Sequence, residues 1–188
     1  MDKVDRRIKR TQRLLQESLI ELTLEKGFDA VTIRDITERA DVGYTTFFRH
    51  YQDKEALLAD VLDAMRDEFR DLLLPHSITS NPEETGVLLF EYVIENADLC
   101  RVLLSSTNTM VLLRPMQEMG FEEAGVMFPG PQIREIPMDV ASSHLMTSLV
   151  MLIRWWLDHE MPYTPTQMGK IAATLIIRPL IAALQNPQ

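Results

Sequence analysis

The sequence contains very little cysteine: Cys100 is the only one among 188 residues. A single thiol cannot form an intrachain disulfide, and such a chain suits a reducing compartment. The neighbouring residues Leu99, Val102 and Leu103 are apolar, which favours a buried structural thiol over a redox switch. We therefore expect a cytoplasmic protein without disulfides.

Long apolar runs are also missing. The longest uncharged stretch, residues 140–153, is interrupted by Ser, Thr and His, whereas a membrane-spanning helix needs about 20 apolar residues. The first ten residues are basic and lack the apolar segment of a secretory signal. The composition, with 46% hydrophobic and 25% charged residues, is that of a soluble globular protein. We expect no membrane partner.

Motifs for catalysis and metal binding are absent from the sequence. His50, His76, His144 and His159 have no metal-ligand spacing. No GxSxG, HExxH, glycine-rich phosphate loop or paired cysteine occurs. An enzyme would need a nucleophile, a base or a metal in such an arrangement. The sequence therefore predicts a protein that is not an enzyme and has no cofactor, no catalytic residue and no metal site.

An excess of positive charge is missing as well. The net charge is −9, and a negative surface repels DNA phosphates. The charge is unevenly distributed, however, because residues 1–56 contain 11 Lys or Arg and 11 Asp or Glu, which places the whole excess in residues 57–188. Six basic residues between Lys3 and Arg13 face only one acidic residue there, Asp5. This segment is expected to follow a phosphate strand or to enter the minor groove; a solvated tail without a partner is the alternative.

The sequence does contain a helix–turn–helix pattern, in residues 32–54. Ile33 and Ile36 fall at helical spacing and belong to the apolar face of a helix of about two turns. Thr32 and Asp35 approximate a capping box, so that helix should begin at Ile33.

A turn and a second helix complete the pattern. Gly43 is expected to adopt a positive φ in the turn, and the second helix should begin at Tyr44. Phe47 and Tyr51 are four residues apart and should pack inward. The outward-facing set is aromatic, hydroxylic and basic: Tyr44, Thr45, Phe48 and Arg49. Asp53 should cap the next helix. Two helices joined in this way place the second one in the major groove of DNA.

These residues resemble TetR-type (TetR/AcrR) transcriptional regulators from about Thr11 to Leu58. The matching segments are Glu25-Lys26-Gly27-Phe28, Thr32-Ile33-x-x-Ile36, Ala40-Asp41-Val42 and Thr46-Phe47-Phe48-Arg49-His50-Tyr51-x-Asp53-Lys54. The resemblance implies an all-α fold, with an N-terminal three-helix DNA-binding domain in residues 1–56 and a C-terminal helical ligand-binding and dimerisation domain in residues 57–188. It implies a dimeric, sequence-specific regulator of transcription, a repressor released by a small-molecule ligand. An activator of the same family, or an adaptor that has lost DNA binding, is the alternative.

The resemblance also implies the DNA contacts. Phosphate-binding positions are matched by Thr32, Thr46, His50 and Lys54, and positions that approach base edges by Tyr44, Thr45 and Arg49. Arg34, Gly43 and Phe48 complete the predicted DNA-binding set. Gly43 stands where the family often has a capping Ser or Asn, and Phe48 stands where it often has a Tyr that bonds a phosphate.

Helical spacing predicts the remaining elements. Helices are expected at about residues 7–26, 53–74, 83–96, 99–105, 109–119, 138–161 and 165–185, with a linker at 76–86 and an irregular segment at 120–137. Pro75 should end the second of these helices. Thr164 and Gln167 flank Pro165 as a capping box, and Pro179 should kink the last helix.

The last two helices, about 138–161 and 165–185, carry more apolar surface than one small domain can hide. This surface predicts a homodimer, and the resemblance implies a four-helix bundle that reads a palindromic operator on double-stranded DNA. Closure of the monomer core is the alternative. The resemblance also implies a small-molecule effector in the second domain, where plain core is again the alternative. The candidate ligand residues are Met110, Arg114, His144, Met151 and Trp155.

Overall fold

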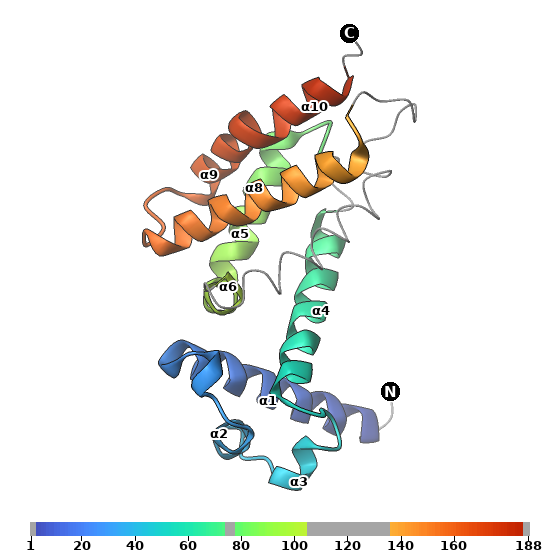
Figure 1. Cartoon of the computed structure of the whole chain (residues 1–188), viewed down its shortest axis with the longest axis vertical. Coiled ribbons are helices and arrows are strands. Elements are labelled where there is room, and N and C mark those ends of the chain that lie inside the picture. Colours follow the sequence, from blue (N-terminus) through green and yellow to red (C-terminus); the bar gives the residue numbers. More distant parts are fainter. Residues whose placement is uncertain (1–2, 74–77, 105–135, 186–188) are drawn as a thin grey trace. The chain divides into compact units, whose positions relative to one another are not determined.

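A computed structural model describes residues 3–73, 78–104 and 136–185, and the regular elements in these ranges are all helical (Figure 1). The all-α prediction is thus confirmed. The chain forms two compact units, Met1–Arg66 and Asp67–Gln188. Their boundary falls inside helix α4 (Lys54–Leu73), whereas the sequence placed it near the start of that helix. The helix predicted at 109–119, most of the irregular segment at 120–137 and the predicted stop at Pro75 lie outside the described residues.

The first unit contains α1 (Lys3–Lys26), the 3-10 turn η1 (Phe28–Ala30), α2 (Ile33–Arg39), α3 (Tyr44–Phe47) and the first turns of α4. Helix α1 begins at Lys3, earlier than the expected start near Arg7. The added turn contains two good helix formers, Lys3 and Arg6. Gly27 ends α1 as predicted, and its φ of 79° is one that glycine adopts without strain.

The centre of the first unit's core consists of four aliphatic residues and one phenylalanine, all without solvent exposure. They come from α1, α2, α3 and α4, so each helix contributes to one shared interior: Leu15, Leu19, Ile36, Phe47 and Leu57. Short helices are marginal in water by themselves. Helices α2 and α3 therefore depend on this shared core.

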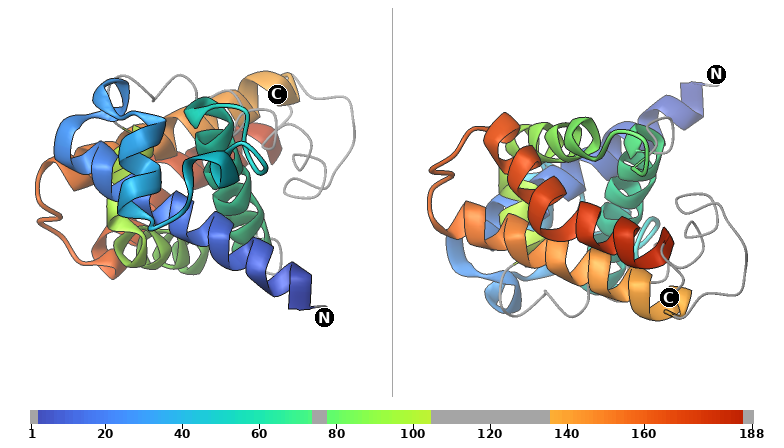
Figure 2. Two further views of the ribbon diagram at one scale, coloured as in Figure 1. Left: turned by 90° about the horizontal axis from the view of Figure 1, so that it is seen from below. Right: turned by 90° about the horizontal axis from the view of Figure 1, so that it is seen from above.

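The second unit contains α5 (Pro82–Glu95), α6 (Ala97–Leu104), α8 (Met138–Asp158), α9 (Pro165–Ala172), the π-helical segment η2 (Ala173–Ile177) and α10 (Arg178–Gln185). Figures 1 and 2 show α8 running beside the segment from α9 to α10. The predicted linker at 76–86 is too long, because Asn81 accepts a hydrogen bond from the backbone of Glu84 and starts α5 at Pro82. Gly86 therefore lies within a helix.

Gly86 is buried where α5 meets α9. A Cβ atom on Gly86 would lie 2.7 Å from the carbonyl oxygen of Gly169, and one on Gly169 would lie 2.5 Å from the backbone nitrogen of Val87. Both distances are shorter than van der Waals contact. The two helices thus touch backbone to backbone, and only glycine fits at the two positions.

Helix α8 ends at Asp158, earlier than the predicted Met161. Glu160 and Met161 have φ values of 59° and 54°, which a right-handed helix cannot contain. The side chain of Trp156, which has no solvent exposure, holds the connection to α9. Its Nε1 donates to the carbonyl of Tyr163 over 2.9 Å, and its ring meets Phe90 edge to face at 5.2 Å.

The capping box predicted at Pro165 is confirmed. Thr164 accepts from the backbone of Gln167, and the Gln167 side chain accepts from the backbone of Thr164. The irregularity expected at Pro179 takes the form of the π-helical segment η2, which ends just before it. A proline ring collides with the carbonyl four residues earlier, here that of Leu175, and η2 contains this residue.

Residues 165–184 are long and apolar enough to span a membrane by length and composition alone. This segment instead supplies core residues to the second unit. The buried apolar side chains are Met168, Ala172, Ala173, Ile176, Ile177, Leu180 and Ile181. Core helices of soluble proteins pass the same test of length and composition, so one such helix is weak evidence for a membrane span.

Cys100 is buried in α6. Burial raises the pKa of its thiol to about 12, so the reactive thiolate is scarce at neutral pH. This agrees with the prediction of a structural thiol.

The contact between the glycines predicts the effect of a single methyl group. Replacing a helical glycine by alanine ordinarily stabilises a helix by about 0.5–1 kcal/mol. We expect Gly169→Ala to do the opposite and to destabilise the protein by about 1–3 kcal/mol through overpacking. Thermal unfolding followed by circular dichroism measures the difference. Thr174→Ala, at an exposed position of the same helical segment, is the control. A melting temperature for Gly169→Ala at or above that of the wild type would contradict the backbone contact.

Candidate nucleic-acid interface

The start of α2 is fixed by the predicted capping box, which is confirmed. Thr32 Oγ1 accepts from the backbone of Asp35 at 3.2 Å, and Asp35 Oδ2 accepts from the backbone of Thr32 at 2.8 Å. Lys26, at the end of α1, donates to the same carboxylate at 2.7 Å. Hydrogen bonds from Lys26 and then from Thr32 hold the pKa of Asp35 well below its usual range. The cap therefore also ties α2 to α1.

The other end of α2 is tied to α1 by a cluster that spacing did not reveal. Arg39 donates to Glu21 at 3.0 Å and makes a two-pronged contact with Glu25 at 3.0 and 2.8 Å. These hydrogen bonds raise the pKa of Arg39 above its ordinary value. The partners lie 14 and 18 residues away in sequence, so only the fold brings them together.

The turn between α2 and α3 differs from the prediction in one respect. Asp41 has the positive φ, at 51°, whereas Gly43 is extended, with φ at −60°. Aspartate is one of the few side chains that tolerate the left-handed region. The prediction for Gly43 is therefore wrong, and this glycine instead caps α3 without a side-chain hydrogen bond.

Helix α3 has only four residues and is held from beneath by two aromatic side chains. Phe47 is fully buried, Tyr51 is nearly so, and their ring centroids are 5.8 Å apart. The Tyr51 hydroxyl donates to the Asp60 carboxylate of α4, which also accepts from Gln16 of α1 at 3.0 Å. Burial and the neighbouring Asp60 raise the pKa of the Tyr51 hydroxyl. The predicted inward pair is confirmed.

The outward side of α3 is aromatic and basic, as predicted. Tyr44 is 54% exposed and Phe48 48% exposed, and their rings meet edge to face at 5.3 Å. Thr45 and Arg49 are exposed beside them. The second helix is shorter than expected, because α3 ends at Phe47 and the next three residues form a turn.

The other predicted DNA-binding residues differ in how exposed they are. Thr32, Arg34 and Gly43 are exposed, whereas Thr46 and His50 are half-buried. The Thr32 hydroxyl already donates to Asp35 at 2.7 Å within the cap. The His50 ring lies 6.3 Å from that of Tyr51.

The predicted phosphate ligand Lys54 makes its hydrogen bonds within the protein. Its Nζ donates to the backbone carbonyls of Phe28 and Val31 at 2.9 and 3.0 Å, and to that of Asp29 at 3.3 Å. It also lies 4.5 Å from the centre of the Phe28 ring. An ammonium group has three protons to donate, and three carbonyls accept them here. The lysine therefore anchors the η1 turn to the start of α4, which Asp53 caps by accepting from the backbone of Ala56, as predicted.

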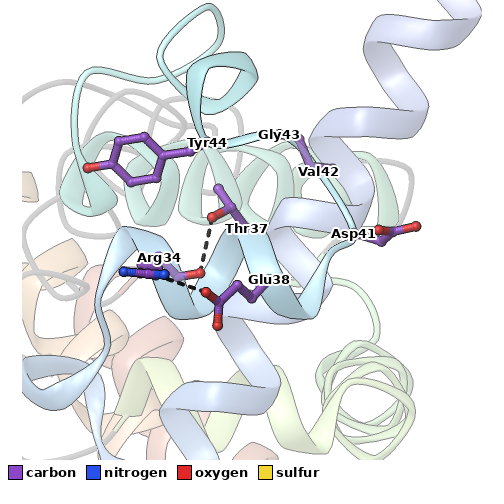
Figure 3. Close-up of a pocket in the computed structure, with 7 residues that line it drawn as sticks. All are labelled: Arg34, Thr37, Glu38, Asp41, Val42, Gly43 and Tyr44. Carbon is purple, nitrogen blue, oxygen red and sulfur yellow. Dashed lines mark hydrogen bonds and ion pairs between the residues drawn. The ribbon is translucent and has the colours of Figure 1, made fainter.

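An open hollow of about 750 Å³ separates α2 from the start of α3 (Figure 3). Figure 3 shows Arg34 and Tyr44 extending to the same side of the hollow, with Glu38 hydrogen-bonded to Arg34. The lining residues are Arg34, Thr37, Glu38, Asp41, Val42, Gly43 and Tyr44. Sequence reasoning missed Thr37, Glu38 and Asp41. Glu38 lies four residues after Arg34 on α2, and this helical spacing could have revealed it.

The basic N-terminal segment is part of α1 rather than an extended arm. Because the helix starts at Lys3, its basic side chains project from a helical surface. Those shown to be exposed are Arg6, Arg7, Lys9, Arg10 and Arg13.

Of the five predicted ligand residues, the structure describes three. His144, Met151 and Trp155 are all exposed on α8, where their spacing places them on one face of the helix. Met110 and Arg114 lie outside the described residues. No group of three or more His, Cys, Asp or Glu side chains that could hold a metal occurs within residues 3–73, 78–104 and 136–185.

Two family models match the chain. The one described as bacterial regulatory proteins, tetR family, matches residues 17–61, and the one described as transcriptional regulator C-terminal region matches residues 80–178. The HTH-type transcriptional regulator YxbF of Bacillus subtilis (strain 168), itself uncharacterised, is 31% identical over 111 residues, which are 58% of this chain and 27% of that protein. The match covers less than half the length of each of three curated relatives.

Solved structures share the fold. A TetR transcriptional regulator from Streptococcus agalactiae 2603V matches with a TM-score of 0.65 and 23% identity, over 93% of this chain and 97% of that one. RolR in complex with resorcinol matches with a TM-score of 0.54 and 20% identity, over 97% of both chains. At these identities the likeness concerns the fold alone.

The salt bridge at the α2 cap predicts a pH dependence of stability. Since the pKa of Asp35 is lowered in the folded state, its ionised form stabilises the fold above the unfolded pKa of about 3.9, and this contribution is lost as the pH falls further. We expect Asp35→Asn to lower the melting temperature at pH 7 and the difference from wild type to shrink below about pH 4. Asp29→Asn, an exposed neighbour without a capping hydrogen bond, is the control. A difference that stays constant with pH would show that the charge of Asp35 is not involved.

Proposed function

This chain belongs to the tetR family of bacterial regulatory proteins, and from that premise we propose that it is a homodimeric, sequence-specific repressor of transcription that a small molecule releases from DNA. The observation that carries the proposal is the exposed tip of α3, with Tyr44 and Phe48 outside and Phe47 and Tyr51 buried beneath. Side chains held on a rigid support are suited to reading base edges.

Base reading is assigned to three exposed residues at the tip of α3. Tyr44, Phe48 and Arg49 offer two aromatic rings and one guanidinium. A guanidinium forms paired hydrogen bonds with guanine, and apolar groups contact the thymine methyl group. Arg34 and Thr45 flank this set, and both are exposed. The tip thus contains chemistry for both kinds of major-groove contact.

Phosphate contacts are assigned to the polar groups around the tip. Thr46 and His50 are half-buried near it, and the hydroxyl of Thr32 and the unsubstituted backbone of Gly43 lie at the starts of α2 and α3. The exposed arginines of the first turns of α1 add positive charge to a unit whose net charge is small. We reassign Lys54 from a phosphate ligand to an internal anchor, because its hydrogen bonds go to the η1 carbonyls.

Dimerisation is assigned to the exposed apolar side of the last helices. On α8, Val140 is 55% exposed and Trp155 41% exposed, and Met151 lies between them at helical spacing. Leu175 of the neighbouring η2 segment is 69% exposed. A second copy would cover these side chains symmetrically. A dimer of this kind sets two copies of α3 about 34–36 Å apart, which requires a palindromic operator on double-stranded DNA.

The effector is assigned to the second unit. RolR, a protein of the same fold, is known in complex with resorcinol. Met110 and Arg114 remain predictions for an effector site. His144, Met151 and Trp155 are better assigned to the dimer face, because they are exposed on α8. A regulator of this kind acts in the cytoplasm, where the DNA and the effector are both accessible.

An activator and an adaptor without DNA binding are the alternatives. Activation differs from repression only in where the operator lies relative to the promoter, and the exposed tip serves both. Selection of genomic fragments by the purified protein at physiological salt separates a DNA-binding regulator from an adaptor. An enriched inverted repeat supports the regulator, and its absence supports the adaptor. Transcription from a promoter that carries the repeat then shows whether the protein represses or activates.

Tyr44→Ala tests base reading by α3. We expect the ratio of operator affinity to random-DNA affinity to fall by about tenfold, since a base contact contributes about 1–3 kcal/mol of discrimination. Fluorescence anisotropy with both DNA fragments measures the ratio. Tyr163→Ala removes a tyrosine of similar exposure, 44%, from the second unit and should leave the ratio unchanged. An unchanged ratio in Tyr44→Ala would mean that α3 does not read the sequence.

Leu175→Glu tests the dimer face. Burying a charged side chain in a dimer interface costs free energy. We therefore expect a predominantly monomeric protein whose operator affinity is reduced at least tenfold. Ile94→Glu, which changes another exposed apolar residue of the second unit, should remain dimeric. Sedimentation velocity at micromolar concentration measures the assembly. Dimers in both variants would exclude η2 from the interface.

A further inference from the structure

We propose that Glu38 determines DNA specificity through Arg34, as a positioning residue that restrains this arginine and competes with DNA phosphates for it. This proposal rests on the DNA-binding function proposed above. Arg34 Nε donates to Glu38 Oε1 at 2.9 Å, across one turn of α2. Both side chains line the hollow beside Tyr44 (Figure 3).

The hydrogen bond leaves the guanine-binding end of Arg34 free. The guanidinium carries five N–H donors, and Glu38 takes the one on Nε. The two Nη atoms remain as a fork that matches the O6 and N7 acceptors of guanine. The Arg34 side chain is 81% exposed, so this fork is open to a partner. Glu38 thus fixes which edge of the guanidinium is presented without covering it.

The same contact makes Arg34 less attractive to a bare phosphate. An exposed arginine contributes to binding of any DNA sequence, because each neutralised phosphate releases counterions. Glu38 already supplies a negative partner that balances part of the Arg34 charge. The attraction between Arg34 and a phosphate is therefore weakened. Guanine is uncharged and accepts two hydrogen bonds from the Nη atoms, so its contact with Arg34 depends less on that charge.

Specificity gained in this way comes from weakening the wrong partner more than from strengthening the right one. The contact between Arg34 and Glu38 is an exposed pair, and such pairs contribute little to folding. Glu38 can accordingly be changed with little effect on stability, which makes its effect on DNA binding measurable.

Glu38→Gln is the test, with anisotropy titrations of the selected operator and of a scrambled fragment of equal length. We expect affinity for the scrambled fragment to rise by about fivefold, the scale of one exposed ion pair, with a smaller change for the operator. The specificity ratio therefore falls. In an Arg34→Ala background, Glu38→Gln should leave the ratio unchanged, because the residue acts through the arginine. Arg34→Lys should weaken operator binding while retaining binding of the scrambled fragment, since lysine keeps the charge but lacks the fork.

Glu17→Gln is the matched control. Glu17 pairs with Arg13 across one turn of α1, at 3.4 Å, and both side chains are exposed. The same loss of one negative charge there should change affinity for both fragments alike. An equal fall of the ratio in Glu17→Gln, or a fall that persists in the Arg34→Ala background, would overturn the proposal. If the wild type itself does not distinguish the two fragments, the proposed function fails, and the role of Glu38 fails with it.

Discussion

The burial of Phe47 and Tyr51 is the constraint on which the candidate interface depends. A helix of four residues has no stability by itself, so α3 exists because its aromatic underside is packed into the core of the first unit. The hydroxyl of Tyr51 adds direction to that packing, since the Asp60 carboxylate that accepts from it also accepts from Gln16. Helices α1 and α4 thereby set the orientation of the exposed tip, and its outward-facing side chains need no part in the fold.

Much of the local structure in both units could be predicted from the sequence because the determining residues are close together along the chain. The capping boxes at Thr32 and Thr164 each occupy four consecutive residues. The division of α3 into buried and exposed sides follows from helical spacing alone. One local signal failed where two residues competed for the same role. Asp41 and Gly43 both tolerate a positive φ, and nothing local decides between them.

Contacts between distant residues could not be predicted in this way. Lys54 donates to carbonyls more than 20 residues away, and the Arg39 cluster joins two helices. In each case the sequence showed a charged residue, but only the fold showed that its partners are groups of the same chain. The same limit applies to His144 and Trp155, since only the fold shows that both are exposed on α8.

The close approach of Gly86 and Gly169 has a mechanical consequence for the second unit. Helices separated by side chains can shear past one another by small rotamer adjustments. Between α5 and α9 the opposing surfaces are rigid backbone, which has no rotamers to change. Sliding of α5 against α9 at this crossing is therefore blocked. The two helices must move together as one rigid body in any conformational change that a bound molecule causes.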